Sequence, residues 1–166
     1  MTTLSPAQRD RAAGVLVATA AGDALGAGYE FGPPLPTSTP VGMIGGGGFG
    51  WAPGEWTDDT SMATVIARCA AAGGDLRSDQ VQDQIAQGWI DWARTAPDVG
   101  NQTRDVLSRA ERDAGGRPAT AAQLREEARA HHHRAGRSGG NGSLMRTAPV
   151  ALAYLHDEDA LVEAAT

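Results

Sequence analysis

Helical spacing of apolar residues is the feature of this chain that most limits its fold. Two segments, 62–69 and 81–92, each carry apolar side chains three or four positions apart, which is the spacing of one helix face. A sustained alternation of apolar and polar residues, which a half-buried strand needs, is nearly absent. The 166 residues are enough for one domain with a core, so the sequence predicts an all-α fold.

Capping residues, prolines and glycines mark where the helices should begin and end. Ser5 and Pro6 suit a helix start. The segment 32–56 is so dense in glycine and proline that no regular element should survive there, and such a long loop is usually functional or mobile. We expect helices over residues 6–21, from Asp58 or Asp59 to Gly73, after Ser78, over 103–114 and 119–135, over 145–154 with a break near Pro149, and from 159 onward.

Composition narrows the class of protein. The chain carries 14 Lys and Arg against 20 Asp and Glu, a formal net charge of −6, which argues against nucleic-acid binding. Cys69 is the only cysteine and is expected to be a small buried side chain. No run approaches the ~20 apolar residues of a membrane helix. The run 12–20 superficially resembles a signal peptide, but its cleavage would detach the motif that follows, so we expect a cytoplasmic protein.

Two groups of residues receive structural interpretations. Consecutive side chains on a helix point ~100° apart, so His131, His132 and His133 do not converge on one ion, and we expect them on the exposed surface. Trp89 and Trp92 fall at helical spacing with apolar residues, which favours core packing.

The segment Thr57-Asp58-Asp59-Thr60 places two adjacent carboxylates between two hydroxyls where the glycine-rich loop should end. One interpretation is a helix N-terminus, where these side chains satisfy free N–H groups and complement the helix dipole. The other is a site for a hard cation such as Mg²⁺, which prefers carboxylate and hydroxyl oxygens. A dinuclear site would need more acidic ligands than this segment offers.

Two further segments place polar groups in unusual settings. Asp23 stands within an apolar stretch, and because an unpaired buried carboxylate is costly, we expect it to accept hydrogen bonds or to lie near a metal. Glu30 lies just beyond the first helix and is a candidate mobile acid or base. The segment 139–149 runs from a glycine-rich loop toward a helix, which presents backbone N–H groups to a phosphate or diphosphate, with Asn141 and Arg146 extending its reach.

In this order, the segments Gly22–Gly26 with Glu30, Trp56–Thr60 and Gly140–Arg146 with Pro149 resemble the ADP-ribosylglycohydrolase family. That family includes the dinitrogenase reductase-activating glycohydrolases and the ADP-ribosylarginine hydrolases. The resemblance covers roughly residues 11–155, and Val99–Thr103 is similar to a short Gly-x-x-Thr element of the family. It implies a helical bundle, of which residues 1–166 would form the N-terminal part of a single domain.

The resemblance also implies a site. It implies two Mg²⁺ or Mn²⁺ ions held by Thr57, Asp58 and Asp59, with both aspartates also catalytic, and Glu30 as a catalytic loop residue near the scissile bond. The substrate-binding residues for ADP-ribose would be Asp23, Gly140, Asn141, Gly142, Ser143 and Arg146.

The family's remaining metal ligands lie in a C-terminal Asp-x-Asp-Thr motif. The segment Asp157-Glu158-Asp159 is no convincing substitute, because no Thr follows it. We therefore expect a hydrolase that removes ADP-ribose from a modified protein side chain or related conjugate, inactive without a C-terminal segment that is its own or a separate chain. Two alternatives stay open: a non-catalytic ADP-ribose- or metal-binding member of the same fold, and a helical interaction module without a ligand.

Overall fold

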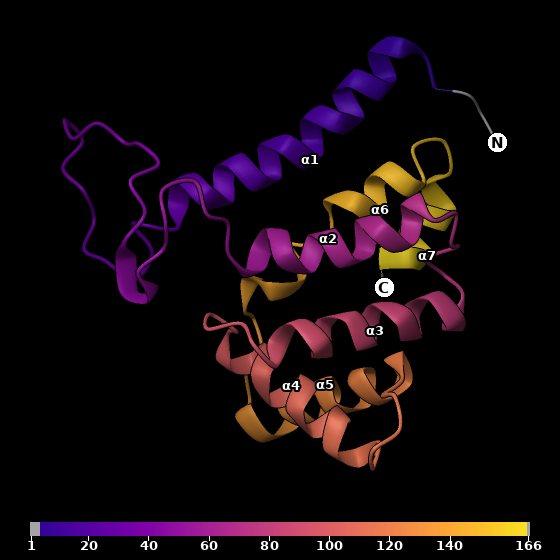
Figure 1. Cartoon of the computed structure of the whole chain (residues 1–166). Coiled ribbons are helices and arrows are strands. Elements are labelled where there is room, and N and C mark those ends of the chain that lie inside the picture. The colour runs from indigo at the N-terminus through magenta and orange to yellow at the C-terminus, as the bar shows by residue number, and fades with distance from the viewer. Residues whose placement is uncertain (1–3, 166) are drawn as a thin grey trace. The chain divides into compact units, whose positions relative to one another are not determined.

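The chain folds into helices joined by loops, in a computed structural model that describes residues 4–165 (Figure 1). Within that range no strand occurs, and the β-type contact that is present is an isolated bridge between Gly46 and Trp51. The all-α prediction is confirmed. The chain divides into two compact units, one up to Thr60 and the other from Ser61 onward. No helix within residues 4–165 is long and apolar enough to cross a membrane.

The first unit starts with α1 (Pro6–Gly26). Ser5 caps this helix, because its hydroxyl accepts a hydrogen bond from the Gln8 N–H while the Gln8 side chain accepts one from the Ser5 N–H. The predicted end at Ala21 is wrong, since the helix continues to Gly26. Glycine lowers helix propensity by only about 1 kcal/mol, which is too little to end a helix that is anchored further along.

The loop between α1 and the next long helix is folded back on itself. The Tyr29 hydroxyl donates to the Gly42 carbonyl (2.9 Å) and accepts from the Gly42 N–H (3.1 Å). The bridge between Gly46 and Trp51 encloses a short 3-10 turn, η1 (Gly47–Phe49). Gly45 has φ +64°, and a Cβ there would collide with the Trp51 carbonyl, so the loop needs glycine at this position.

The second unit is organised around α3 (Asp79–Ala93), which is capped by the Ser78 hydroxyl. One hydrophobic cluster packs α3 against the next two helices through side chains such as Ile90 and Leu107. A second cluster includes Ile66 and Ile85. The other helices are α2 (Asp58–Ala71, which begins in the first unit), α4 (Asn101–Asp113), α5 (Ala121–Ala135), η2 (Asn141–Ser143), α6 (Ala148–Ala153) and α7 (Glu158–Ala165).

Two expectations for this unit need correction. The predicted helix over 145–154 is shorter, and Pro149 lies in the first turn of α6 instead of breaking it, because the first turn needs no N–H donor at that position. The prediction of an exposed histidine run is wrong for His131, whose side chain is only 18% exposed and whose Nδ1 lies 2.9 Å from Asp105 Oδ2. His132 and His133 are exposed as expected.

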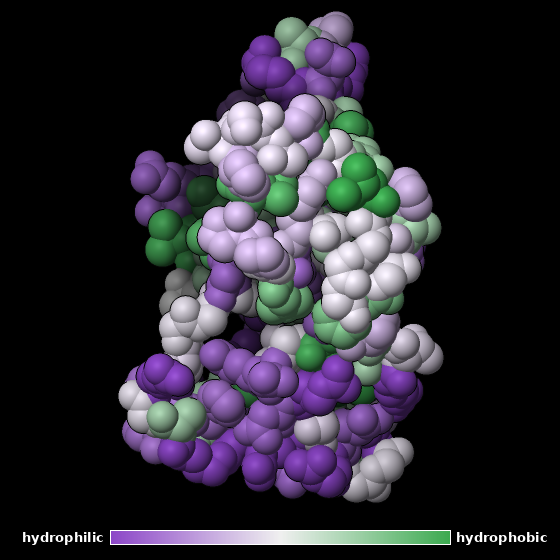
Figure 2. Space-filling view, turned by 90° about the vertical axis from the view of Figure 1, so that its left-hand side faces the viewer, coloured by the Kyte–Doolittle hydropathy of each residue, from purple (hydrophilic) through white to green (hydrophobic). Residues whose placement is uncertain are grey.

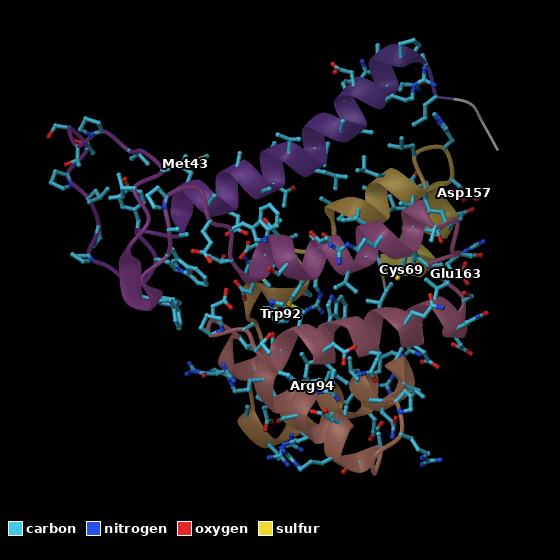
Figure 3. The ribbon with its side chains drawn as sticks, viewed as in Figure 1. Met43, Cys69, Trp92, Arg94, Asp157 and Glu163 are labelled. Atoms are coloured by element: carbon cyan, nitrogen blue, oxygen red, sulfur yellow. The ribbon has the colours of Figure 1, made fainter. Side chains whose placement is uncertain are left out.

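The tryptophan and cysteine interpretations hold in part. Trp89 is half-buried and packs against both hydrophobic clusters, which makes it a core residue, while Trp92 is half-buried without belonging to either cluster. Cys69 lies on α2 (Figure 3) and packs against the second cluster. Burial raises the pKa of its thiol, so the thiol stays protonated at neutral pH.

Asp105 on α4 links that helix to α5 through ion pairs. The part of the molecule formed by α4 and α5, at the bottom of Figures 1 and 2, is mostly hydrophilic on the face that Figure 2 shows. The Asp105 carboxylate accepts hydrogen bonds from Arg109 Nε (2.7 Å) and Arg134 Nη2 (3.1 Å), in addition to the contact with His131. The hydrogen bonds to His131 and Arg109 hold the pKa of Asp105 well below its usual range. The network therefore stabilises the fold above the ordinary carboxyl pKa and loses this effect in acid.

We expect Asp105→Asn to lower the free energy of unfolding at pH 7 by roughly 0.5–1 kcal/mol, the range of a half-exposed ion pair. The difference from the unchanged chain should shrink progressively as the pH falls below the ordinary carboxyl pKa of about 4, because the carboxylate then protonates in the unfolded chain while the folded-state carboxylate, whose pKa is lowered, stays charged. Urea unfolding at pH 7 and at pH 3 measures both effects. Glu126→Gln, at an exposed pair on α5, is the control; equal effects of the two changes at pH 7 would contradict the assignment.

Candidate active site

Asp23, near the C-terminal end of α1, holds the start of α2. Its carboxylate accepts hydrogen bonds from the Thr57 N–H (3.0 and 3.1 Å to its two oxygens), from Thr57 Oγ1 (2.5 Å) and from the Thr60 N–H (3.0 Å). All three residues belong to the first unit. The expectation that Asp23 accepts hydrogen bonds is confirmed, and its assignment as a substrate-binding residue stays a prediction.

The pair Asp58 and Asp59 occupies the first turn of α2, where both side chains are half-buried. Thr57 precedes them with only 4% exposure, and its Oγ1 lies 3.5 Å from Asp58 Oδ1. The capping interpretation of this segment loses part of its basis, since Asp23 from α1 already accepts the N–H groups of Thr57 and Thr60. The helix dipole still favours the two carboxylates at this end.

These side chains suit a hard cation in kind. A hydroxyl that donates its proton to Asp23 keeps lone pairs for a metal, and carboxylate oxygens are preferred ligands of Mg²⁺ and Mn²⁺. Within residues 4–165, however, no group of three or more His, Cys, Asp or Glu side chains is close enough to hold a metal ion. If Thr57, Asp58 and Asp59 bind a metal, as the sequence predicts, they can supply only part of its ligands.

Glu30 follows α1 after a turn in which the Tyr29 N–H donates to the Gly26 carbonyl. Its side chain is exposed. The next residue, Phe31, has φ +63° and is the sole residue other than glycine with a left-handed backbone among residues 4–165. The chain thus turns sharply at the candidate acid or base.

The glycine-rich loop lies in the second unit beside the start of α4. A Cβ at Gly140 would lie 3.2 Å from Gln102 Oε1, and one at Gly142 would lie 3.3 Å from Thr103 Oγ1. The Gly-x-x-Thr element and the glycine-rich segment are therefore neighbours, which only the fold reveals. The loop first enters the short 3-10 helix η2, and a turn separates it from α6.

Arg146, which follows this loop, turns toward the core. Its guanidinium lies 4.1 Å from the centre of the Trp89 ring, and its Nη1 lies 3.8 Å from Met62 Sδ. The Trp89 indole N–H donates to the Met62 carbonyl (3.1 Å), so one contact set joins this segment to α2 and α3. Burial lowers the pKa of Arg146 to about 10, and the side chain stays charged at neutral pH. Sequence analysis missed this stack, because nothing in the sequence connects positions 89 and 146.

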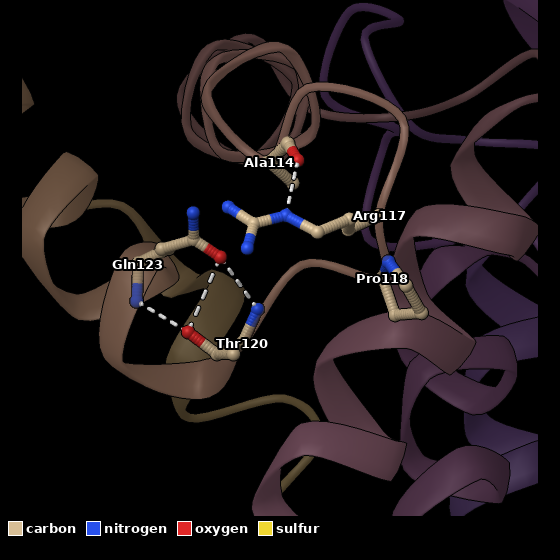
Figure 4. Close-up of a pocket in the computed structure, with 5 residues that line it drawn as sticks. All are labelled: Ala114, Arg117, Pro118, Thr120 and Gln123. Carbon is tan, nitrogen blue, oxygen red and sulfur yellow. Dashed lines mark hydrogen bonds between the residues drawn. The ribbon is translucent and has the colours of Figure 1, made fainter.

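A surface hollow of about 490 Å³ opens elsewhere in the second unit, between α4 and α5 (Figure 4). Arg117 reaches across it, with Nε 3.4 Å from the Ala114 carbonyl oxygen. The lining residues are Ala114, Arg117, Pro118, Thr120 and Gln123. No predicted site residue is among them.

The structure thus forms two groups from the predicted site residues. Asp23 and Thr57 are hydrogen-bonded in the first unit, with Asp58 and Asp59 following directly, and Glu30 belongs to the same unit. Gly140 and Gly142 lie next to Gln102 and Thr103 in the second unit. Their binding and catalytic roles stay predictions.

We expect Asp23→Asn to lower the free energy of unfolding by about 1–3 kcal/mol, because the amide leaves one of its buried donors without an acceptor. Hydrogen exchange should accelerate at the Thr57 and Thr60 amides more than elsewhere. Asp10→Asn, at an exposed position of the same helix, is the matched control. Similar unfolding energies and exchange rates in the two variants would contradict the structural role.

Comparison with known proteins places this arrangement in a family. The sequence model of the ADP-ribosylglycohydrolase family matches residues 4–166. The chain is 35% identical to the ADP-ribosylarginine hydrolase Tri1 of Pseudomonas putida over 93% of its own length and 39% of that protein. It is 34% identical to the ADP-ribosyl-[dinitrogen reductase] glycohydrolase of Rhodospirillum rubrum over 90% of its own length and 47% of that protein.

A solved structure agrees with the sequence relatives. The chain superposes on an ADP-ribosylglycohydrolase-related protein complex with a TM-score of 0.65 and 35% identity, over 94% of this chain and 47% of that one. The chain therefore spans less than half the length of these relatives. The matched residues include Asp23, the Thr57–Asp59 segment and the glycine-rich loop, and the chain belongs to the ADP-ribosylglycohydrolase family.

Proposed function

We propose that this chain carries part of the active site of a metal-dependent hydrolase that removes ADP-ribose from a modified protein side chain or a related conjugate. The observation that carries the proposal is the Asp23 carboxylate, which holds Thr57 ahead of the two aspartates at the start of α2. Family membership and the names of the relatives support the reaction class. Two of the relatives are named ADP-ribosylarginine hydrolases, so arginine-linked ADP-ribose is the substrate to test.

The proposed cofactors are two Mg²⁺ or Mn²⁺ ions, with Thr57, Asp58 and Asp59 as ligands. When bound, such ions orient hydroxyl groups and lower the pKa of a water molecule. Two hard cations together take about a dozen oxygen ligands, more than these residues supply. We therefore propose that hydrolysis needs a further segment, from the same polypeptide or from a separate chain, which corresponds to the remaining length of the relatives.

The residues of this chain have distinct tasks in the proposed reaction. Asp23 keeps Thr57 and the start of α2 in place through hydrogen bonds that do not depend on substrate. Glu30 acts as the general acid or base at the glycosidic bond, whose cleavage passes through an oxocarbenium-like state. Backbone N–H groups of the Gly140–Ser143 loop and the charge of Arg146 favour the diphosphate. The reaction is expected in the cytoplasm.

A second candidate is a non-catalytic member of the family that binds ADP-ribose or metal. It is consistent with the finding that residues 4–165 hold no group of three or more His, Cys, Asp or Glu side chains close enough for a metal ion. Turnover separates the two candidates: hydrolysis of ADP-ribosylarginine by this chain, alone or with the C-terminal part of the Rhodospirillum relative added, supports the enzyme. Binding without turnover, both by the chain alone and with the added segment, supports the second candidate. Turnover by the chain alone would refute the need for a further segment.

Changing Asp58 or Asp59 to Ala should remove the thermal stabilisation by Mn²⁺ plus ADP-ribose, because a ligand that binds only the folded state must stabilise it. Loss of capping alone would lower stability by only about 1 kcal/mol and leave this response unchanged. Differential scanning fluorimetry with and without ligands measures the effect, with Glu55→Gln on the preceding loop as the control. Full stabilisation of both aspartate variants would refute their assignment as ligands.

Glu30→Gln should reduce turnover by about 10²–10⁴-fold while the affinity for ADP-ribose stays within a factor of two of the wild type, because acid–base help acts on the reacting bond. The comparison uses whichever mixture hydrolyses ADP-ribosylarginine, with calorimetry for affinity. A loss of affinity with retained turnover would instead make Glu30 a binding residue.

A further inference from the structure

Three aromatic side chains gather on the folded loop after α1. The Phe31 and Phe49 ring centres lie 6.3 Å apart in an edge-to-face arrangement, and those of Phe49 and Trp51 lie 5.7 Å apart. Phe31 is 80% exposed and Phe49 is 44% exposed. Neither phenylalanine belongs to a hydrophobic cluster of the described core. We call Phe31, Phe49 and Trp51 the aromatic surface.

The Phe31 backbone is strained at this surface. Its φ of +63° is a left-handed conformation that glycine adopts freely and a bulky side chain does not. A large apolar ring that is mostly in water adds no core packing to offset the strain. Strain of this kind persists where the surroundings impose it and is concentrated at binding and catalytic sites.

The loop holds the aromatic surface in place. The Tyr29 hydroxyl makes two hydrogen bonds with Gly42, and the bridge between Gly46 and Trp51 is closed by N–H to carbonyl bonds of 2.7 and 2.9 Å. Gly28 lies so close to Gly45 that a Cβ would collide with the Gly45 carbonyl. Met43, on the same loop, is also partly exposed (Figure 3).

The chain segment that carries the aromatic surface has charges of one sign. Glu30 precedes Phe31 directly in the chain, and no Lys, Arg or His occurs from Ala12 to Ala67. The same stretch carries five carboxylates: Asp23, Glu30, Glu55, Asp58 and Asp59. Aromatic ring faces attract cations, and a guanidinium stacks on them especially well. The surface therefore suits a cationic side chain better than an anionic or a purely apolar one.

We infer that the aromatic surface binds the guanidinium of the arginine side chain that carries ADP-ribose. That arginine is the side chain concerned rests on the proposed function. That this surface binds it rests on the exposed rings, the strained Phe31 backbone and the negative charge of the surrounding segment. An arginine side chain keeps its positive charge at neutral pH, so it can stack on Phe31 or Phe49 while Glu30 supplies the opposite charge. The surface selects arginine conjugates and leaves free ADP-ribose unaffected.

The test uses NMR titration of the whole chain with N-acetylarginine methylamide and with its uncharged analogue N-acetylcitrulline methylamide. We expect the arginine probe at millimolar concentrations to shift signals of residues 30–31 and 49–51, including the Trp51 indole, and the citrulline probe to leave them in place. In Phe31→Gly these shifts should be lost, although the variant should unfold at the same or a higher temperature because its backbone strain is relieved. Val41→Ser, at another exposed position of the loop, should behave like the unchanged chain.

A second measurement connects the surface to the substrate. The affinity for an ADP-ribosylated arginine peptide should fall about two- to thirty-fold in Phe31→Gly, the range of a lost cation–π contact, while the affinity for ADP-ribose stays unchanged. Equal shifts with both probes, or arginine binding by Phe31→Gly that matches the unchanged chain, would overturn the inference. Arginine shifts without any stabilisation by Mn²⁺ and ADP-ribose would support the surface and refute the proposed function, and the reverse result would refute the surface alone.

Discussion

The hydrogen bonds of the Asp23 carboxylate hold the start of α2, where Thr57, Asp58 and Asp59 lie. Asp23 sits among apolar neighbours on α1, where an unpaired charge would be costly, and the N–H and hydroxyl groups of Thr57 together with the Thr60 N–H provide its partners. The same bonds satisfy N–H groups that the start of α2 would otherwise leave open. The N–H and hydroxyl donors stabilise the charge of Asp23, and the Asp23 carboxylate satisfies the unpaired N–H groups at the start of α2.

The same contact also helps to fix the long loop between α1 and α2 in place. The 31 residues between α1 and α2 (27–57) would be free to move unless the ends and the interior of this loop were held by contacts. Here Asp23 secures the far end at Thr57, and Tyr29 and the bridge between Gly46 and Trp51 secure the interior. Glu30 and the aromatic surface consequently stand on a folded scaffold, which suits recognition better than a mobile segment would.

In the second unit, the glycine-rich segment is followed by a short helix instead of a long one. α6 is only six residues long. The glycine-rich segment lies beside Gln102 and Thr103 at the start of α4. The Arg146 guanidinium stacks on Trp89, a residue shared by both hydrophobic clusters. A charged side chain can occupy this half-buried place because the ring face and the Met62 sulfur replace part of its hydration.

The sequence by itself determined the helical class, the start of most helices and the family, because capping residues, apolar spacing and ordered motifs are local signals. Ser5, Ser78 and Thr120 each cap the helix that follows. It misplaced the end of α1, the role of Pro149 and the setting of His131, whose outcomes depend on residues distant in the chain. Only the tertiary structure decided that Asp23 caps α2, that Arg146 stacks on Trp89, and that Phe31 joins Phe49 and Trp51 in a strained, exposed group. Such contacts join positions tens of residues apart, and they follow from packing and backbone geometry that no local pattern encodes.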